Sequence, residues 1–301
     1  MKTMMKFLLL VFLTTIAFFV VSALMPYSTA FKAINQSADP SVALYILATI
    51  SWTCFTIVYI VKRSRWEKKK LMIVLPLMLF LVLSFMMQIE TMFFGHAFKV
   101  LTIGDILLIM IANGTVPLVA APLSLILFRR KDIRTGLGPA YMASASNLFG
   151  SQSLLIKLAL TGIIYVVIYF VFGYFVAWQV SDLRAFYTGR ETDNGFIGGL
   201  IDNLRDRPVI FPFQFFRGVL FGLFVLPLAQ MFSNQPRTLL ISLLLVFSTV
   251  SITLIIPNAL FPDSVRWGHF REMMSSMSVF AVVVWWIYAK YRVRRIQSSQ
   301  G

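Results

Sequence analysis

The stretch Leu71–Phe94, LMIVLPLMLFLVLSFMMQIETMFF, decides the fold class, because Glu90 is its only charged residue. About 20 apolar residues are enough for an α-helix to cross the hydrocarbon core of a bilayer. Lys68, Lys69 and Lys70 stand directly before it, and such cations mark the cytoplasmic end of a membrane helix. The stretch therefore predicts a membrane-spanning helix.

The rest of the chain repeats this pattern. Of its 301 residues, 58% are hydrophobic and 13% are charged, whereas about 25% are charged in an average soluble domain. The sequence predicts an all-α, polytopic transmembrane bundle, a single integral membrane domain with spanning helices at residues 7–25, 42–61, 71–94, 106–128, 154–178, 209–232, 239–256 and 269–290. The first has the basic start of a signal peptide, but its apolar run is long, so we expect a retained helix.

Lysine and arginine residues in the short loops predict the orientation. With the amino terminus inside, most of the 27 basic residues fall on the cytoplasmic side: Lys2, Lys6, Lys62, Arg63, Arg65, Lys68, Lys69, Lys70, Arg129, Arg130, Lys131, Arg134, Lys157, Arg237, Lys290, Arg292, Arg294 and Arg295. Both termini are then cytoplasmic, and the net charge of +15 faces anionic lipid headgroups. The sequence thus predicts a lipid bilayer as partner rather than nucleic acid, and a multi-pass protein of the bacterial inner membrane.

Proline and glycine residues predict two irregular helices. The run Asn113-Gly114-Thr115-Val116-Pro117 should interrupt the fourth span, and Pro227 should kink the sixth. Outside the membrane, the loop Gln179–Pro208 has apolar residues at helical spacing, namely Phe196, Ile197, Leu200, Ile201 and Leu204. We expect this loop to form a short amphipathic helix that covers the outer surface.

Ionisable residues inside a membrane span are costly to bury and mark functional sites by default. Arg217 lies about two turns into the sixth span from outside, and Gln214 shares its helix face. His269, Glu272 and Ser276 form one stripe at the head of the eighth span. We expect a polar pocket in the outer leaflet, formed by Glu90, Gln214, Arg217, His269, Glu272 and Ser276.

Three functions are compatible with this cluster. In the leading interpretation, Arg217 and Gln214 bind a carboxylate or phosphate of a small anionic or polar ligand, for transport or sensing. In the second, Zn²⁺ bound by Glu90, His96, His269 and Glu272 activates water, as in metal-dependent hydrolases. In the third, Arg217 makes a structural ion pair with Glu90 or Glu272. The residues alone leave catalysis, ligand and protein partners open.

Overall fold

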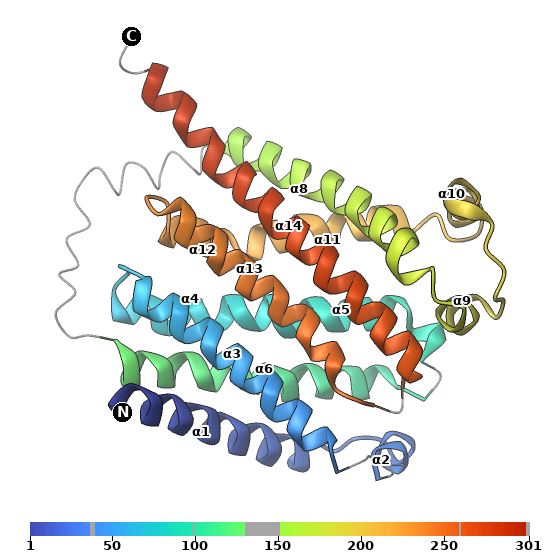
Figure 1. The fold of residues 1–301 in the computed structure, drawn as a ribbon, viewed down its shortest axis with the longest axis horizontal. Coiled ribbons are helices and arrows are strands. Elements are labelled where there is room, and N and C mark those ends of the chain that lie inside the picture. The colour runs from blue at the N-terminus through green and yellow to red at the C-terminus, as the bar shows by residue number, and fades with distance from the viewer. Residues whose placement is uncertain (37–39, 99, 130–150, 259, 299–301) are drawn as a thin grey trace. The chain divides into compact units, whose positions relative to one another are not determined.

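The computed structural model describes residues 1–36, 40–98, 100–129, 151–258 and 260–298 (Figure 1). Within these ranges the regular structure is helical and no strand occurs. Eight of the helices in these ranges are long and apolar enough to cross a membrane: Lys2–Leu24, Val42–Arg63, Lys68–Phe93, Ile103–Phe128, Ser153–Ala177, Ile210–Met231, Pro236–Ile255 and Asp263–Ala289. The all-α, polytopic fold class predicted from the sequence is therefore confirmed. Arg130, Lys131 and Arg134, which the sequence predicts on the cytoplasmic side, lie outside the described ranges.

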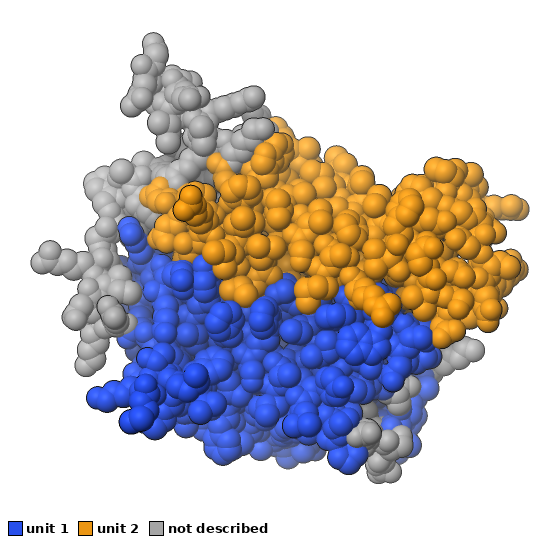
Figure 2. Space-filling model, in the orientation of Figure 1, with its two compact units in different colours: residues 1–133, 248–270 blue, residues 134–247, 271–301 orange. Residues whose placement is uncertain are grey.

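The chain forms two compact units (Figure 2). Unit 1 comprises Met1–Ile133 and Ser248–Phe270, and unit 2 comprises Arg134–Phe247 and Arg271–Gly301. Two of the three boundaries along the chain fall inside continuous helices, α13 (Pro236–Ile252) and α14 (Asp263–Ser298), and the third lies outside the described residues. Each unit has its own set of packed helices, so residues from distant parts of the sequence meet within a unit.

Unit 1 is built around one central helix. Its elements are α1 (Lys2–Leu24), α2 (Thr29–Gln36), α3 (Val42–Arg63), α4 (Lys68–Phe80), the π-helix η1 (Leu81–Phe85), α5 (Met86–Phe93), the 3-10 helices η2 (Gly95–Ala97) and η4 (Thr253–Ile255), and α6 (Ile103–Phe128). Helix α6 packs against α1, α3 and α4. A Cβ atom on Gly114 would lie 2.5 Å from the Phe80 ring, so the close approach of α4 and α6 requires glycine there.

The start of α6 is fixed by Asp105, whose side chain is buried. Thr102 and Asp105 form a capping box, in which each side chain accepts from the other residue's backbone amide. The backbone amide of Ser28 also donates to Asp105 Oδ1 at 2.8 Å. One carboxylate therefore ties the turn between α1 and α2 to the first turn of α6.

The predicted interruption of the fourth span at Asn113–Pro117 is wrong, because α6 is a continuous helix through Pro117 and Pro122. Proline removes one backbone hydrogen bond, which a packed membrane helix tolerates. The irregular turn lies instead in the third span, as the π-helix η1. There Ser84 Oγ donates to the Met110 carbonyl at 2.5 Å, so the partner helix supplies a bond to α6.

Unit 2 contains the remaining helices. These are α8 (Ser151–Phe172), the π-helix η3 (Gly173–Ala177), α9 (Ser181–Thr188), α10 (Gly195–Asp206), α11 (Ile210–Phe224), α12 (Leu226–Met231) and the unit 2 parts of α13 and α14. The rings of Phe221, Phe247 and Phe280 lie within 5.4–6.1 Å of one another, and Tyr165 lies 5.0 Å from Phe280. These rings join α8, α11, α13 and α14 in one aromatic core.

Helices α8 and α11 approach each other closely in this unit. A Cβ atom on Gly218 would lie 2.5 Å from Tyr165 Cβ and 2.8 Å from Gly162 Cα. The same construction at Gly222 meets Thr161 Oγ1 at 2.7 Å. Small residues spaced four apart let membrane helices pack backbone to backbone, and this packing fixes the face of α11 that is buried.

The predicted helix boundaries agree less well with the structure than the predicted number of membrane helices does. The break at Val225 between α11 and α12 confirms the irregularity expected near Pro227. Helix α10 agrees with the amphipathic helix expected in the outer loop. Helices α2 and α9 were not predicted, since eight residues are too few to show a period. Helix α14 starts at Asp263, earlier than the predicted His269.

Candidate functional site

The candidate site begins with Arg217 on α11, whose side chain is only 1% exposed. The buried face of α11 consists of Ile210, Gln214, Arg217, Gly218, Phe221 and Gly222. Because Gly218 and Gly222 must face α8, Arg217 is placed inside unit 2. The helix packing therefore buries a permanent cation.

Aromatic rings surround the guanidinium group. Its central carbon lies 5.7 Å from the ring centre of Tyr165 and 5.8 Å from those of Phe213 and Phe221. Arginine near the face of aromatic rings gains a cation–π attraction, which grows when water is excluded. These rings hold the cation in an apolar surrounding, where its attraction for an anion is stronger than in water.

Gln214 is the hydrogen-bonding neighbour of Arg217 on the same helix. Arg217 Nη1 donates to Gln214 Oε1 at 2.9 Å. Since arginine has only donors, the amide atom that faces it must be the oxygen. The amide nitrogen Nε2 therefore points away from Arg217. Among the residues that the structure describes, this nitrogen has no hydrogen-bond acceptor, although the side chain is 0% exposed.

Helix α14 contributes Glu272 and Ser276 to the same unit. They are 8% and 4% exposed, and Ser276 Oγ donates to Glu272 Oε1 at 3.2 Å. Helices α11 and α14 run in the same direction (Figure 1) and touch through Phe221 and Phe280, whose ring centres are 6.1 Å apart.

The register of these two helices relates their polar residues. Arg217 and Ser276 each lie four residues before the contacting rings, which corresponds to about 6 Å along the helix axis. Glu272 lies one further turn before Ser276, at about the level of Gln214. A second contact joins the same two helices, since the carbonyl oxygen of Gly222 on α11 accepts from Tyr288 Oη on α14 at 2.9 Å. The arrangement of unit 2 therefore sets a cation, an amide, a hydroxyl and a carboxylate at similar heights on two contacting helices.

The other predicted site residues belong to unit 1. Glu90 lies on α5 and His96 in η2. The His269 ring lies 5.7 Å from that of Phe261, which in turn lies 5.2 Å from Phe98. Four of the six expected ligand-binding residues thus share unit 2, namely Gln214, Arg217, Glu272 and Ser276. The convergence of all six at one depth stays a prediction.

The predicted zinc ligands are divided in the same way. Glu90, His96 and His269 belong to unit 1, whereas Glu272 belongs to unit 2. Within the described part of the chain, no group of three or more His, Cys, Asp or Glu residues is arranged to hold a metal ion. The described geometry therefore gives the zinc interpretation no support.

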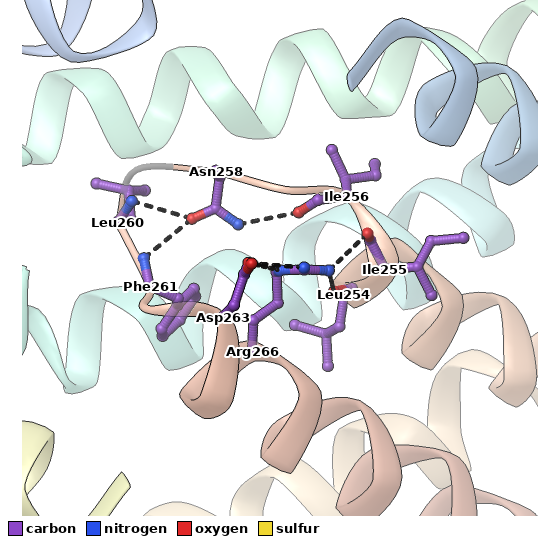
Figure 3. A network of polar contacts seen from close by, with 8 residues as sticks. All are labelled: Leu254, Ile255, Ile256, Asn258, Leu260, Phe261, Asp263 and Arg266. Carbon is purple, nitrogen blue, oxygen red and sulfur yellow. Dashed lines mark hydrogen bonds and ion pairs between the residues drawn. The ribbon is translucent and has the colours of Figure 1, made fainter. Parts of the chain in front are cut away.

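Sequence reasoning missed a polar network around the buried Arg266 in unit 1 (Figure 3). Arg266 is 3% exposed; it pairs with Asp263 at 2.8 Å and donates to the Ile255 carbonyl at 2.7 Å. Asn258 Oδ1 accepts from the amides of Leu260 and Phe261. The spacing of Asp263 and Arg266 is the signal that could have revealed it, since residues three apart share a helix face. These bonds stabilise the segment that connects η4 to α14.

Lys157 is a third buried cation, after Arg217 and Arg266, and sequence reasoning left it among the cytoplasmic charges. It lies in the second turn of α8 and is 2% exposed. Burial of a lysine so near a helix end was not visible in the hydropathy pattern, because long basic side chains usually reach the membrane surface. It belongs to unit 2, like Arg217.

Comparison with known proteins yields no relative. No family model, no curated protein and no solved structure matches the chain. The function is therefore argued from the residues and their geometry alone.

Proposed function

We propose that this multi-pass membrane protein binds a small anionic or polar ligand in unit 2, for transport or sensing, with Arg217 and Gln214 as the main recognition residues. The observation that carries this proposal is the buried Gln214 Nε2, which has no acceptor among the described residues. A buried donor without an acceptor destabilises a protein by about 1–3 kcal/mol, and more than nine in ten buried polar groups are satisfied. An oxygen of a bound ligand would satisfy this donor.

The chemistry of the neighbours favours an anion as that ligand. Arg217 offers planar N–H donors and Gln214 offers an amide N–H from the same helix face. Carboxylate and phosphate oxygens accept such paired donors, and charge-assisted bonds of this kind are about twice as strong as neutral ones. Ser276 and Glu272 on α14 add a hydroxyl and a carboxylate at similar height, which would favour a ligand that also carries a donor.

The substitution Gln214→Glu tests the proposal. It keeps the shape of the side chain and an oxygen that accepts from Arg217, but it replaces the amide donor by an acceptor. We expect the variant to fold and to lose at least tenfold in affinity for the anion, about 1.4 kcal/mol. The measurement is the rise in melting temperature of purified protein with a panel of monocarboxylates, phosphomonoesters and inorganic phosphate.

A matched control is Gln235→Glu, because Gln235 Oε1 also accepts from a residue three positions later, Thr238, at 3.3 Å. This control should respond to the panel like the wild type. Arg217→Ala should abolish the response. A response that survives in both Gln214→Glu and Arg217→Ala would refute the ligand role and leave Arg217 as part of a structural ion pair. If the wild type binds an anion from the panel, its uptake of that anion into liposomes separates transport from sensing.

A further inference from the structure

We propose that unit 1 binds the phosphate headgroup of an anionic phospholipid at the corner formed by Trp66, Lys70 and Arg129. The proposal concerns unit 1 alone and is independent of the ligand site in unit 2. It rests on a concentration of basic side chains at the ends of four helices and on the way in which Trp66 organises two of them.

The basic side chains gather where α1 begins, α3 ends, α4 begins and α6 ends. They are Lys2, Lys6, Lys62, Arg63, Arg65, Lys68, Lys69, Lys70 and Arg129. Glu67 is the only acid among the described residues at these ends, and none of these cations forms an ion pair with a described carboxylate. Eight of the nine are exposed, and Arg129 is partly buried. Among the described residues, one carboxylate therefore stands against nine cations at these helix ends.

The surface is held in place by contacts to neighbouring backbone and rings. Lys6 Nζ donates to the Leu127 carbonyl at 2.8 Å, and Lys62 Nζ lies 5.1 Å from the Phe128 ring centre. Both contacts draw cations toward the end of α6. The charges are thus positioned before any lipid arrives, which lowers the entropy lost on binding.

Trp66 forms the corner of this surface. Its side chain is 2% exposed, and Lys70 Nζ lies 3.7 Å from its ring centre. Its carbonyl accepts from Arg129 Nη2. One residue therefore contacts a lysine from α4 through its ring and an arginine at the end of α6 through its carbonyl.

Two observations point to a phosphate at this corner. Arg129 Nη1 is a buried atom without a hydrogen-bond acceptor among the described residues, and a phosphate oxygen would supply one. The first turn of α4 carries Lys68, Lys69 and Lys70, and the N-cap residue Glu67 is the one acid beside them, so these cations outnumber the carboxylate at a helix end that attracts anions. Since α4 and α6 both continue into membrane spans, the phosphate within reach is that of a lipid.

The test is native mass spectrometry of the full chain released from nanodiscs made of equal parts phosphatidylglycerol and phosphatidylcholine. The wild type should retain phosphatidylglycerol in preference. The double variant Lys70→Ala/Arg129→Ala should lose at least tenfold in retained phosphatidylglycerol, because each cation near an anionic headgroup contributes about fivefold. The charge-matched control Arg190→Ala/Arg205→Ala, both exposed in unit 2, should retain it like the wild type.

A second double variant and a competition with inorganic phosphate complete the experiment. If the double variant does not fold, Lys70→Gln/Arg129→Lys replaces it, and it should show a reduced retention. Inorganic phosphate at millimolar concentration should not displace the lipid, because it lacks the acyl chains that hold the headgroup at the surface. Equal retention of the two lipids by the wild type, unchanged retention in both corner variants, or displacement by inorganic phosphate would each overturn the proposal.

Discussion

Gly218 shows how much a single residue without a side chain decides in this protein. Its position beside Tyr165 and Gly162 leaves no room for a Cβ atom, and the contact sets the rotation of α11. Arg217 precedes it directly, so the same rotation buries the cation. The candidate site therefore depends on a glycine that carries no chemistry of its own.

We expect Gly218→Ala to lower the stability of the protein by about 1–3 kcal/mol, the usual effect of adding volume to a tightly packed site. The clash with the Gly162 backbone cannot be relieved by turning a side chain. Thermal unfolding of the purified protein in detergent measures the effect. Gly199→Ala on α10 is the control, since a Cβ there meets nothing within 4 Å and alanine favours a helix. Equal melting temperatures for the two variants would contradict the close packing of α8 and α11.

Arg266 provides a second test at this scale. It bridges Asp263 on its own helix and the Ile255 carbonyl at the end of η4. We expect Arg266→Gln to lower the stability by about 1–3 kcal/mol, because the part-buried carbonyl of Ile255 loses its charged donor. Arg271→Gln changes the same charge at an exposed position of α14 and should leave the melting temperature within about 1 °C. A loss of stability in Arg271→Gln as large as that in Arg266→Gln would remove the special role of the network.

At the scale of elements, α10 carries an apolar stripe that the protein does not cover. Ile197, Ile201 and Leu204 are 64%, 57% and 58% exposed, and they share one helix face. The helix lies in the chain between two membrane spans, which end at Ala177 and begin at Ile210. An amphipathic helix in this position is expected to lie in the membrane interface with its apolar face in the lipid.

Spin labels test this placement of α10. A label at Ile201→Cys should be accessible to oxygen dissolved in the bilayer, whereas a label at Asp206→Cys, on the opposite side of the helix, should be accessible to a water-soluble nickel complex. The native Cys54 is 0% exposed, so it should not compete for the reagent. Labels that report the same aqueous surroundings at both positions would place α10 away from the lipid.

At the scale of the whole molecule, the distribution of basic residues predicts that both termini lie in the cytoplasm. Arg65 and Arg190 are exposed positions predicted on opposite sides of the membrane. We expect Arg190→Cys in intact cells to react with a membrane-impermeant maleimide, and Arg65→Cys to react only after the membrane is opened. Reaction of Arg65→Cys but not of Arg190→Cys in intact cells would reverse the assignment of the loops and the leaflet proposed for the lipid headgroup, and reaction of both would contradict the assignment.

The fold class followed from the sequence because membrane insertion depends on local composition. Each span, such as Leu71–Phe94, contains enough apolar residues to be recognised by itself. The interruption expected in α6 failed for the opposite reason. Asn113–Pro117 looks irregular by itself, yet α4 packs against Gly114 and Ser84 bonds to the Met110 carbonyl. Contacts with other helices, which local composition does not report, keep the helix continuous.

The sequence by itself determined the number and approximate position of the membrane helices, their expected orientation and the identity of Arg217 and Gln214 as unusual residues. Tertiary structure decided which of them share a unit, the burial of Arg217, Lys157 and Arg266, and the bond from Asp105 to the turn between α1 and α2. The physical reason is the separation along the chain of the residues that each property depends on. Hydropathy is a sum over neighbours in the chain, whereas burial and hydrogen bonding depend on side chains that approach from distant segments.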